Sequence, residues 1–485
     1  MEHEEPPLHS RFRVTASCSS FNRCTATELA ALIRNRKASP LEVLDSHLKA
    51  IKRINGELNA IVTLAEDQAW EAARRAEAAV MEGAPLGPLH GLPIVVKDVT
   101  QTAHIRTTFG SPLYRDFVPI EDAEVVARLR RAGAIILGKT NTPEFACGAH
   151  TVNELFGATR NPWNPELSPA GSSGGSAVAV ATGMAALAQG TDFGCSIRIP
   201  AAFCGIVGVR TTAGLIPNRG MRLPWDPGQV HGPLARTAED AALMLDAMTG
   251  LDPLWPISVD APWRSALAEV NRLEDARGLR IAYASDLADI GVDEDIDKIC
   301  RSAVRKLASD GARITEVDFD VAEGCAAYKV LRAQWMVGQQ LEHLERLDDF
   351  GPNLRGNVCE GLELDVRAVA EAEHTRERVW SRFCKLFSQY DFIVTPTAPV
   401  SPFPVDVNFP EKVGGRKLTN YVDWIAPAFL VTLVGFPAAS VPVGKTEQAL
   451  PVGLQVIAPR FREPQILGLA KVLQRAHPIG WPPCS

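Results

Sequence analysis

The sequence lacks the cysteine and histidine spacings that are typical of metal sites. No Cys-x-x-Cys pair and no His-x-x-x-His pair occurs, although there are ten residues of each type. A disulfide framework is also not indicated, because such frameworks occur mainly in small secreted domains. The scattered cysteines predict buried or free thiols in a reducing cytoplasm, and we expect neither a metal nor a cofactor. They stand at positions 18, 24, 147, 195, 204, 300, 325, 359, 384 and 484.

Long hydrophobic runs, blocks of like charge and a basic start are missing as well. The longest apolar stretch, near 177–188, is interrupted by Thr182 and Gly183 and is far too short for a membrane span. The first residues, Met-Glu-His-Glu-Glu-Pro-Pro, do not have the basic and apolar regions of a secretory signal. The net charge of −7 is spread evenly, so a nucleic acid partner is not expected. We expect a cytoplasmic protein that binds no membrane.

The composition is that of an ordinary globular protein, and the sequence alternates between helical and strand patterns. It has 485 residues, of which 46% are hydrophobic and 22% charged, which is enough to bury a large core. Residues 40–54 and 65–81 have helical patterns, the first behind a capping box at Ser39. Gly91–Val96 is an apolar stretch bounded by glycine and proline, which predicts a buried strand. This alternation predicts an α/β fold: a mixed central sheet covered by helices on both faces.

Two turns rich in glycine and serine give the strongest signal for chemistry. Residues 171–176 read Gly-Ser-Ser-Gly-Gly-Ser, and residues 190–196 read Gly-Thr-Asp-Phe-Gly-Cys-Ser. The segment between them, 177–187, is rich in alanine and valine and has the length of a buried helix. A loop, helix, loop unit in a compact domain returns near its start, so the serine hydroxyls and backbone N–H groups of both turns should lie together. Such a cluster can supply a nucleophile and an oxyanion hole.

Further motifs accompany the two turns in a fixed order. They are Leu92–Asp98, Gly138–Phe145, Asn161–Asn164, Pro200–Gly205, Asp391–Thr397 and Pro451–Gln455. Together with the serine turns they resemble the amidase signature family of serine hydrolases, over about residues 25–475. The resemblance implies one continuous catalytic domain at 25–480. We expect residues 1–24 to be a poorly ordered N-terminal extension.

The resemblance implies a catalytic triad of the Ser, cis-Ser, Lys type. Ser196 matches the nucleophile, Ser172 the serine that relays the proton, and Lys97 the base. The peptide bond between Gly171 and Ser172 should then be cis. A serine hydroxyl needs a base to take its proton, and a lysine can serve when burial lowers its pKa. The apolar strand that precedes Lys97 offers such burial.

The turn that carries the nucleophile also offers an oxyanion hole, because it can aim four backbone N–H groups at one point. Ser173 is expected to orient the catalytic groups, and Asp192 and Arg198 are expected to hold the loop. The four residues of the predicted oxyanion hole are Phe193, Gly194, Cys195 and Ser196.

Two other interpretations of these residues remain to be compared. Lys97 could form a salt bridge with Asp98, which is the commoner fate of a lysine. The first turn also satisfies Gly-x-Ser-x-Gly, the nucleophile elbow of α/β hydrolases, which would make Ser173 the nucleophile. That class needs a downstream histidine, and no candidate has a convincing sequence context. The candidates are His231, His343, His374 and His477.

The sequence departs from the family pattern at two positions. Cys195 stands where a glycine is usual, and its side chain could narrow or tilt the oxyanion loop. Thr432 stands where an asparagine is usual. Neither change removes a triad member, so both bear on rate and substrate range rather than on reaction class. By resemblance, Ala146 and Cys147 line the acyl pocket. The loop at 213–233 offers residues for a pocket mouth, namely Met221, Leu223 and Trp225.

These observations favour an amidase, a hydrolase acting on carbon–nitrogen bonds other than peptide bonds. The expected substrates are small or aromatic amides and anilides, with esters and carbamates open to the same chemistry. Two alternatives remain. One is the amidotransferase subunit that releases ammonia from glutamine, although no charge that would hold glutamine is evident. The other is a catalytically silent binding protein in which Cys195 has spoiled the oxyanion loop. Whether the chain is a monomer or a homodimer is left open.

Overall fold

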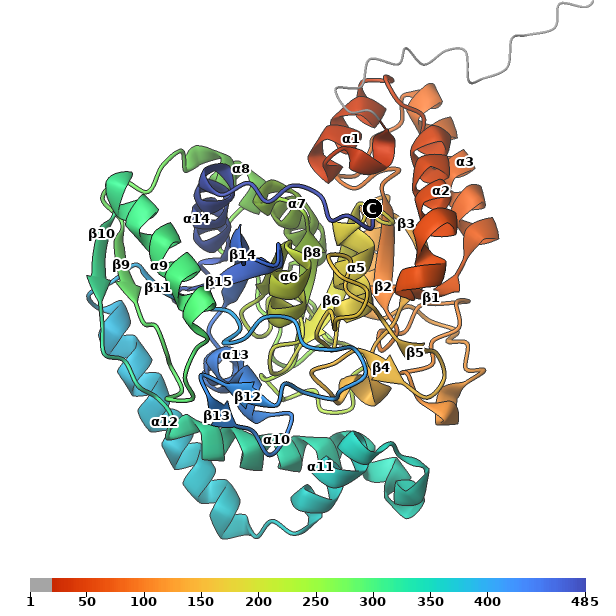
Figure 1. Cartoon of the computed structure of the whole chain (residues 1–485). Coiled ribbons are helices and arrows are strands. Elements are labelled where there is room, and N and C mark those ends of the chain that lie inside the picture. The colour runs from red at the N-terminus through yellow and green to blue at the C-terminus, as the bar shows by residue number, and fades with distance from the viewer. Residues whose placement is uncertain (1–19) are drawn as a thin grey trace, which may run out of the picture.

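Residues 20–485 are described by a computed structural model, and a large mixed sheet runs through it (Figure 1). The sheet has 11 strands in the order β1-β3-β2-β6-β8-β7-β14-β15-β11-β9-β10. Strand β2 pairs in parallel with β3 and β6, whereas β14 and β15 form an antiparallel hairpin. This confirms the predicted α/β fold.

The strands of this sheet are β1 (Ile61–Leu64), β2 (Pro93–Lys97), β3 (Ile135–Thr140), β6 (Leu187–Asp192), β7 (Val207–Arg210), β8 (Val230–Ala235), β9 (Arg280–Tyr283), β10 (Arg313–Glu316), β11 (Phe392–Pro396), β14 (Ala438–Lys445) and β15 (Pro451–Ile457). Two small sheets lie outside it. They pair β4 (Val152–Asn153) with β5 (Gly157–Ala158), and β12 (Lys412–Val413) with β13 (Arg416–Lys417).

Helices cover both faces of the sheet, as expected, and each face has its own core. The first core contains side chains of α1 (Ala26–Arg34), α4 (Glu124–Arg131), α7 (Ala238–Met248), α8 (Ala266–Arg272), α9 (Glu294–Ser309) and α14 (Glu463–Ala476). The opposite face packs against α2 (Pro40–Leu58), α3 (Glu66–Glu82), α5 (Gly174–Ala181), α6 (Arg198–Cys204), α10 (Gly324–Gln340), α12 (Val366–Phe387) and α13 (Ala426–Leu433). Helix α11 (Pro352–Leu362) lies beside α10 at the bottom of Figure 1.

Alternation along β2 decides where its lysine points. Ile94 and Val96 belong to the first core, whereas Val95 packs into the opposite core together with α5. Successive side chains of a strand point to opposite faces, so Lys97 shares the face of Val95. The strand therefore directs the Lys97 amine toward the start of α5, where the first serine turn lies.

Most of the elements predicted from sequence are confirmed. The patterns at 40–54 and 65–81 correspond to α2 and α3, and Ser39 and Glu42 form the expected capping box. The strand predicted at Gly91–Val96 is β2, shifted to Pro93–Lys97.

The prediction of one helix over 177–187 followed by a turn from Gly190 is wrong. Helix α5 is Gly174–Ala181, and Gly183, with a φ of 73°, adopts the left-handed conformation just beyond it. Glycine is the residue that tolerates this conformation best, so it ends the helix. The chain then enters β6, and the second turn contains only Phe193–Ser196.

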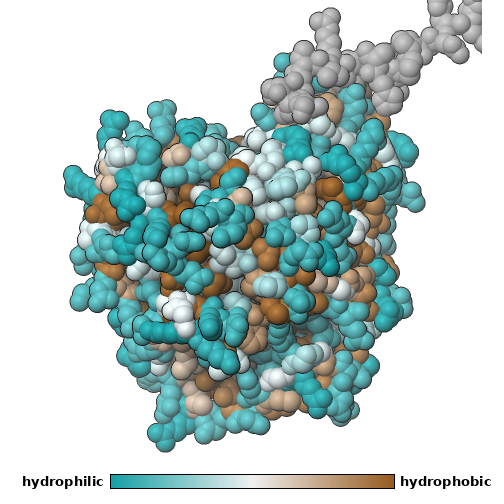
Figure 2. Space-filling model, in the orientation of Figure 1, coloured by the Kyte–Doolittle hydropathy of each residue, from teal (hydrophilic) through white to brown (hydrophobic). Residues whose placement is uncertain are grey.

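The remaining sequence predictions concern the termini and the cysteines. Residues 1–19 of the predicted N-terminal extension lie outside the described residues, and Phe21–Arg23 form a short 3-10 turn. Eight cysteines are free thiols, as predicted, but Cys24 is disulfide-bonded, which corrects the prediction at that position. Within residues 20–485 no helix has the length and apolar character needed to cross a membrane. The face in Figure 2 is mainly hydrophilic, with hydrophobic residues in small groups.

A glycine in α5 gives a test of the packing beside the first serine turn. A Cβ on Gly175 would lie 2.5 Å from the backbone nitrogen of Asn141 and 2.7 Å from the carbonyl oxygen of Ala60. Backbone atoms cannot rotate away, so Gly175→Ala should lower the free energy of unfolding by about 1–3 kcal/mol. Gly56→Ala is the control, because nothing lies within 4 Å of that position in α2. Urea denaturation should show Gly56→Ala to be neutral or stabilising; equal stability of both variants would contradict this packing.

Candidate active site

The candidate site lies at the carboxyl-terminal ends of three neighbouring parallel strands of the sheet. Lys97 is the last residue of β2, Asp192 is the last residue of β6, and Ala146 lies in the segment that follows β3. The carboxyl ends of parallel strands meet at the same edge, which is where open α/β sheets place their ligand sites. The two serine turns approach this edge from the N-termini of α5 and α6.

The Lys97 amine is buried among hydroxyl groups. Its Nζ donates to Ser172 Oγ at 2.6 Å and to Thr191 Oγ1 at 3.0 Å, and its side chain is fully buried. None of the ion pairs formed by residues 20–485 includes Lys97. The alternative pairing with Asp98 is therefore not formed, since the Asp98 carboxylate accepts from Thr108 instead.

This environment makes Lys97 unusually acidic for a lysine. Burial lowers the pKa of its amine from 10.5 to about 7, while the negative charge of Asp192 acts in the opposite direction and recovers only part of the shift. Burial disfavours the charged form of an amine because the protein replaces its hydration incompletely. A substantial fraction of Lys97 is therefore neutral at physiological pH, and its nitrogen can then accept a proton.

The first serine turn holds Ser172 beside this amine. The peptide bond between Gly171 and Ser172 is cis, as the family resemblance implies. Ser173 follows in the turn, and its backbone N–H donates to the carbonyl oxygen of Ser196 at 3.0 Å. Its hydroxyl donates to the Thr191 carbonyl at 3.3 Å. Ser173 thus ties the two turns together, and it forms no hydrogen bond to a histidine of residues 20–485, which the nucleophile-elbow interpretation would require.

The second serine turn presents a hydroxyl and several unused donors to one pocket. Ser196 is 9% exposed and lines that pocket together with Ser172. Its hydroxyl makes no hydrogen bond to another of the described residues. The backbone N–H groups of the whole turn, Phe193–Ser196, are also unpaired within residues 20–485. Unpaired N–H groups beside a hydroxyl are the elements of an oxyanion hole.

Buried charges hold the second turn in place. The Asp192 carboxylate binds Arg198 through two hydrogen bonds, of 2.8 and 3.1 Å, and also accepts from the backbone N–H of Ile197. Arg210 lies 3.6 Å from the same carboxylate. The two guanidinium groups lower the pKa of Asp192 to about 2 despite its complete burial. The carboxylate is therefore occupied as an anchor.

Arg198 extends this anchor to the turn itself. It donates to the Gly194 carbonyl at 2.7 Å and to Thr432 Oγ1 at 2.8 Å. The Thr432 hydroxyl in turn donates to the Gly194 carbonyl at 3.3 Å. Thr432, which replaces the usual asparagine, thus still supports the loop. These contacts place Asp192 and Arg198 against the loop, and their supporting roles stay predictions.

Cys195, the other departure from the family pattern, is fixed between the two turns. Its side chain is 1% exposed, and its thiol donates to the Gly171 carbonyl at 3.4 Å. Burial raises the pKa of the thiol far above its usual value, so it stays protonated. The thiol links the two turns and leaves the N–H groups of its own turn unpaired.

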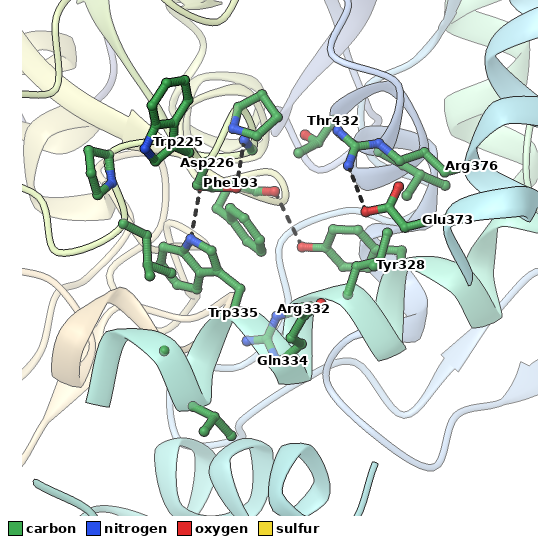
Figure 3. A pocket seen from close by; sticks show the side chains of 18 residues that line it. Phe193, Trp225, Asp226, Tyr328, Arg332, Gln334, Trp335, Glu373, Arg376 and Thr432 are labelled. Atoms are coloured by element: carbon green, nitrogen blue, oxygen red, sulfur yellow. Dashed lines mark hydrogen bonds and ion pairs between the residues drawn. The ribbon is translucent and has the colours of Figure 1, made fainter. Parts of the chain in front are cut away.

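Aromatic side chains enclose the serine pocket. The rings of Phe193 and Trp335 stack with centroids 4.2 Å apart, and Trp335 Nε1 donates to Asp226 at 2.9 Å. Figure 3 shows the Phe193 ring between Trp335 and Tyr328. The open space at the serines is only about 30 Å³. It adjoins two larger cavities, of about 430 and 540 Å³, and Trp335 lines all three.

The residues that were predicted to line the pocket do not all line the same cavity. Ala146 lines the serine pocket. Cys147 does not line it and lies behind the wall, with its thiol 3.4 Å from the Tyr421 hydroxyl. The predicted mouth residues line the two larger cavities: Leu223 and Trp225 the larger, Met221 the smaller.

Sequence reasoning missed several residues of the site, including five that contribute hydrogen bonds or aromatic contacts to it. Three of them lie on α10, spaced by three or four residues along one side of the helix, a pattern that a helical projection of 323–390 would have shown. Thr191 and Tyr421 had no comparable signal, because they meet the site only in the folded chain. The five are Thr191, Tyr328, Arg332, Trp335 and Tyr421.

Comparison with known proteins places the chain among amide-cleaving enzymes. The amidase family profile matches residues 42–467. The chain is 34% identical over 471 residues to an acylamidase of Rhodococcus erythropolis, covering 94% of this chain and 95% of the relative. It is 36% identical over 488 residues to a subunit of the glutamyl-tRNA(Gln) amidotransferase of Acidothermus cellulolyticus, covering 95% of each.

A solved structure shares the fold over nearly the whole chain. A bacterial aryl acylamidase of the amidase signature family superposes with a TM-score of 0.86 and 26% identity, covering 94% of this chain and 96% of that one.

Removing the buried carboxylate of Asp192 should strongly lower the free energy of unfolding. Asp192→Asn would leave Arg198 and Arg210 buried without a negative partner, because all three side chains have 0% exposure. We expect a loss of about 3–5 kcal/mol in the free energy of unfolding, measured by urea denaturation. Glu371→Gln is the control, since the Arg367–Glu371 pair is exposed (84% and 65%) and should contribute little. Similar losses in both variants would show that the Asp192 network does not anchor the loop.

Proposed function

This chain belongs to the amidase family, in which it is a hydrolase of carbon–nitrogen bonds other than peptide bonds, and we propose that it works through an acyl-enzyme on Ser196. Lys97 serves as the base and Ser172 carries the proton between Lys97 and Ser196. The backbone N–H groups of Phe193–Ser196 form the oxyanion hole. This assigns the residues of the site to a Ser, cis-Ser, Lys triad.

The proposed reaction has two halves. Neutral Lys97 takes the proton of Ser172, Ser172 takes that of Ser196, and Ser196 Oγ attacks the amide carbonyl. The negative charge that develops on the carbonyl oxygen is bound by the unpaired N–H groups. The carbon–nitrogen bond then breaks, the amine leaves with a proton from Ser172, and Lys97 returns its proton to Ser172. Water attacks the acyl-enzyme by the same route and releases the acid.

The observation that carries this proposal is the contact between the Lys97 amine and the Ser172 hydroxyl at 2.6 Å. Among residues 20–485 no carboxylate forms an ion pair with the amine, and burial brings its pKa to about 7, so it can act as a base. A structural lysine at this position would need an anion to offset its charge. The Asp192 carboxylate, whose charge favours protonated Lys97, is itself held by two arginines.

The proposed substrate is a small-molecule amide, with esters and carbamates open to the same attack because they pass through the same kind of oxyanion. The relatives named acylamidase and aryl acylamidase support acyl and aryl amides. The aromatic walls formed by Phe193, Tyr328 and Trp335 suit an aryl group. We keep the predictions of a cytoplasmic location and of no nucleic acid, membrane, metal or cofactor partner, and the assembly state remains open.

A second candidate function is the glutamine-hydrolysing subunit of a transfer-RNA amidotransferase. It is favoured by the 36% identity to such a subunit over 95% of both chains. Glutaminase activity and co-purification with partner subunits would distinguish this function from that of a free-standing amidase. A silent binding protein would show neither activity.

The nucleophile assignment predicts a pattern of covalent labelling. A serine-directed fluorophosphonate should form a single adduct with the wild-type chain, detected by intact mass. Ser196→Ala should abolish the adduct, and Lys97→Ala should slow its formation strongly because the base is lost. Ser173→Ala is the matched control in the neighbouring turn and should still be labelled. An adduct that survives in Ser196→Ala and disappears in Ser173→Ala would contradict the triad.

The base assignment predicts the pH dependence of activity. Protonated Lys97 cannot accept a proton, so kcat/KM should fall about tenfold per pH unit below pH 7 and reach a plateau above it. The profile should be measured with a neutral anilide, so that the charge of the substrate does not change. Circular dichroism at each pH is needed because Lys139, also buried, has a pKa of about 7 as well. A flat profile between pH 5 and 8 in folded protein would rule out a lysine base.

A further inference from the structure

One cation in the serine pocket has no negative partner. Arg332 lies on α10, is 6% exposed, and lines the pocket that holds Ser172 and Ser196. No carboxylate within residues 20–485 lies within ion-pair distance of it. Burial opposes its charge, and the groups that favour the charge are Tyr421, Cys147 and Tyr328 rather than a carboxylic acid. The other two buried arginines near the site share the carboxylate of Asp192.

Arg332 is held in a defined position by one of its nitrogens. Its Nη2 donates to the Tyr421 hydroxyl at 2.6 Å, and Asn357 donates to the same oxygen at 2.8 Å. Because that oxygen already accepts two hydrogen bonds, the Tyr421 proton points to the Cys147 thiol, 3.4 Å away. Tyr421, Asn357 and Cys147 thus form a support behind Arg332. This support fixes the side chain without neutralising its charge.

The rest of the guanidinium group remains available. Nε and Nη1 donate no hydrogen bond to any of the described residues, yet neither is among the buried polar atoms that are sealed off without a partner. Both nitrogens therefore keep access to open space. Arg332 lines both the serine pocket and the 540 Å³ cavity next to it. Figure 3 shows it beside Trp335, on the side of α10 that faces these spaces.

A buried charge without a counterion is unfavourable, and proteins normally pair such charges. The planar fork of an arginine matches the two oxygens of a carboxylate. We propose that Arg332 binds a carboxylate of the substrate, so that the preferred substrate is an amide carrying a negatively charged carboxylate a few atoms from the scissile carbonyl. This rests on the proposed function, since it names the substrate class of the same site.

The shape of the site limits where the carboxylate can be. The open space at the serines, about 30 Å³, is close to the volume of one water molecule, so only a small group fits there without movement of the walls. The remainder of the substrate then occupies the adjoining cavities of 430 and 540 Å³. Because Arg332 touches both the serine pocket and the larger cavity, the acid group can be on the acyl side or on the amine side, and the test covers both.

Matched pairs of substrates test the proposal. For the acyl side, the 4-nitroanilides of malonic, succinic and glutaric acids are compared with their methyl esters. For the amine side, acetylated 4-aminobenzoate is compared with its methyl ester, and L-glutamine serves as a carboxylate-bearing primary amide. The wild-type chain should prefer the acid of at least one pair by about 10- to 100-fold in kcat/KM, mainly through KM.

Three variants separate the carboxylate contact from a structural role. Arg332→Met should abolish the preference while leaving the neutral ester within about threefold, and Arg332→Lys should retain part of it. Lys329→Met is the control on the same helix, since Lys329 pairs with Asp423 and lines none of the three cavities. It should keep the full preference. If Arg332→Met fails to fold, the test rests on the other two variants. The preference for the acid should be reduced in Arg332→Lys and unchanged in Lys329→Met.

The outcomes are distinguishable from failure of the proposed function. Fluorophosphonate labelling of Ser196 without a preference for any carboxylate substrate would overturn the role of Arg332 and leave the amidase proposal standing. A preference that persists in Arg332→Met would overturn it too. Absence of both labelling and turnover would instead contradict the proposed function. The anion site could then still be tested alone by measuring succinate binding to the Ser196→Ala protein. This binding should be lost in the double variant that also carries Arg332→Met.

Discussion

The desolvation of one lysine is the constraint on which the rest of the site depends. Lys97 ends a strand whose side chains are fully buried, and its amine meets only hydroxyl groups. A carboxylate close to this amine would return its pKa toward the normal value and abolish its use as a base. The fold avoids this by directing Asp98 to Thr108 and by holding Asp192 between two arginines.

The charged groups around the second serine turn also bear on how the proposed oxyanion would be stabilised. Arg198, Arg210 and Arg332 are buried near the second serine turn, and among the described residues Asp192 is the one carboxylate that forms an ion pair with any of them. Two of these arginines hold the Asp192 carboxylate, and the unpaired N–H groups of the turn would bind the oxyanion of the proposed reaction. We propose that Arg332 complements an anionic substrate and that the N–H groups of Phe193–Ser196 complement the oxyanion.

Local patterns in the sequence allowed the fold class to be predicted, and the resemblance to the amidase signature family implied the central residues, whose roles stay predictions. The strand before Lys97 is marked by its apolar residues, and the serine turns by their glycines. The C-terminal end of α5 was predicted too late, because the alanine-rich segment continues the helical pattern past Gly183. The left-handed conformation of Gly183 ends the helix. Arg332, Tyr421 and Asn357 could not be assigned, since they come from three distant segments and their roles arise from contacts between them. Cys147 was predicted to line the acyl pocket, but it lines a different cavity from the two serines and lies against Tyr421.

Direct titration of the Lys97 amine tests the account most directly. The chain can be prepared with lysine labelled at Cε, and the Lys97 signal assigned by its loss in Lys97→Met, which also separates it from Lys139. The account predicts that the Lys97 signal titrates with a pKa of about 7 in the folded protein. A Lys97 amine that remains charged above pH 10 would contradict the account, because Ser172 and Ser196 would then have no base.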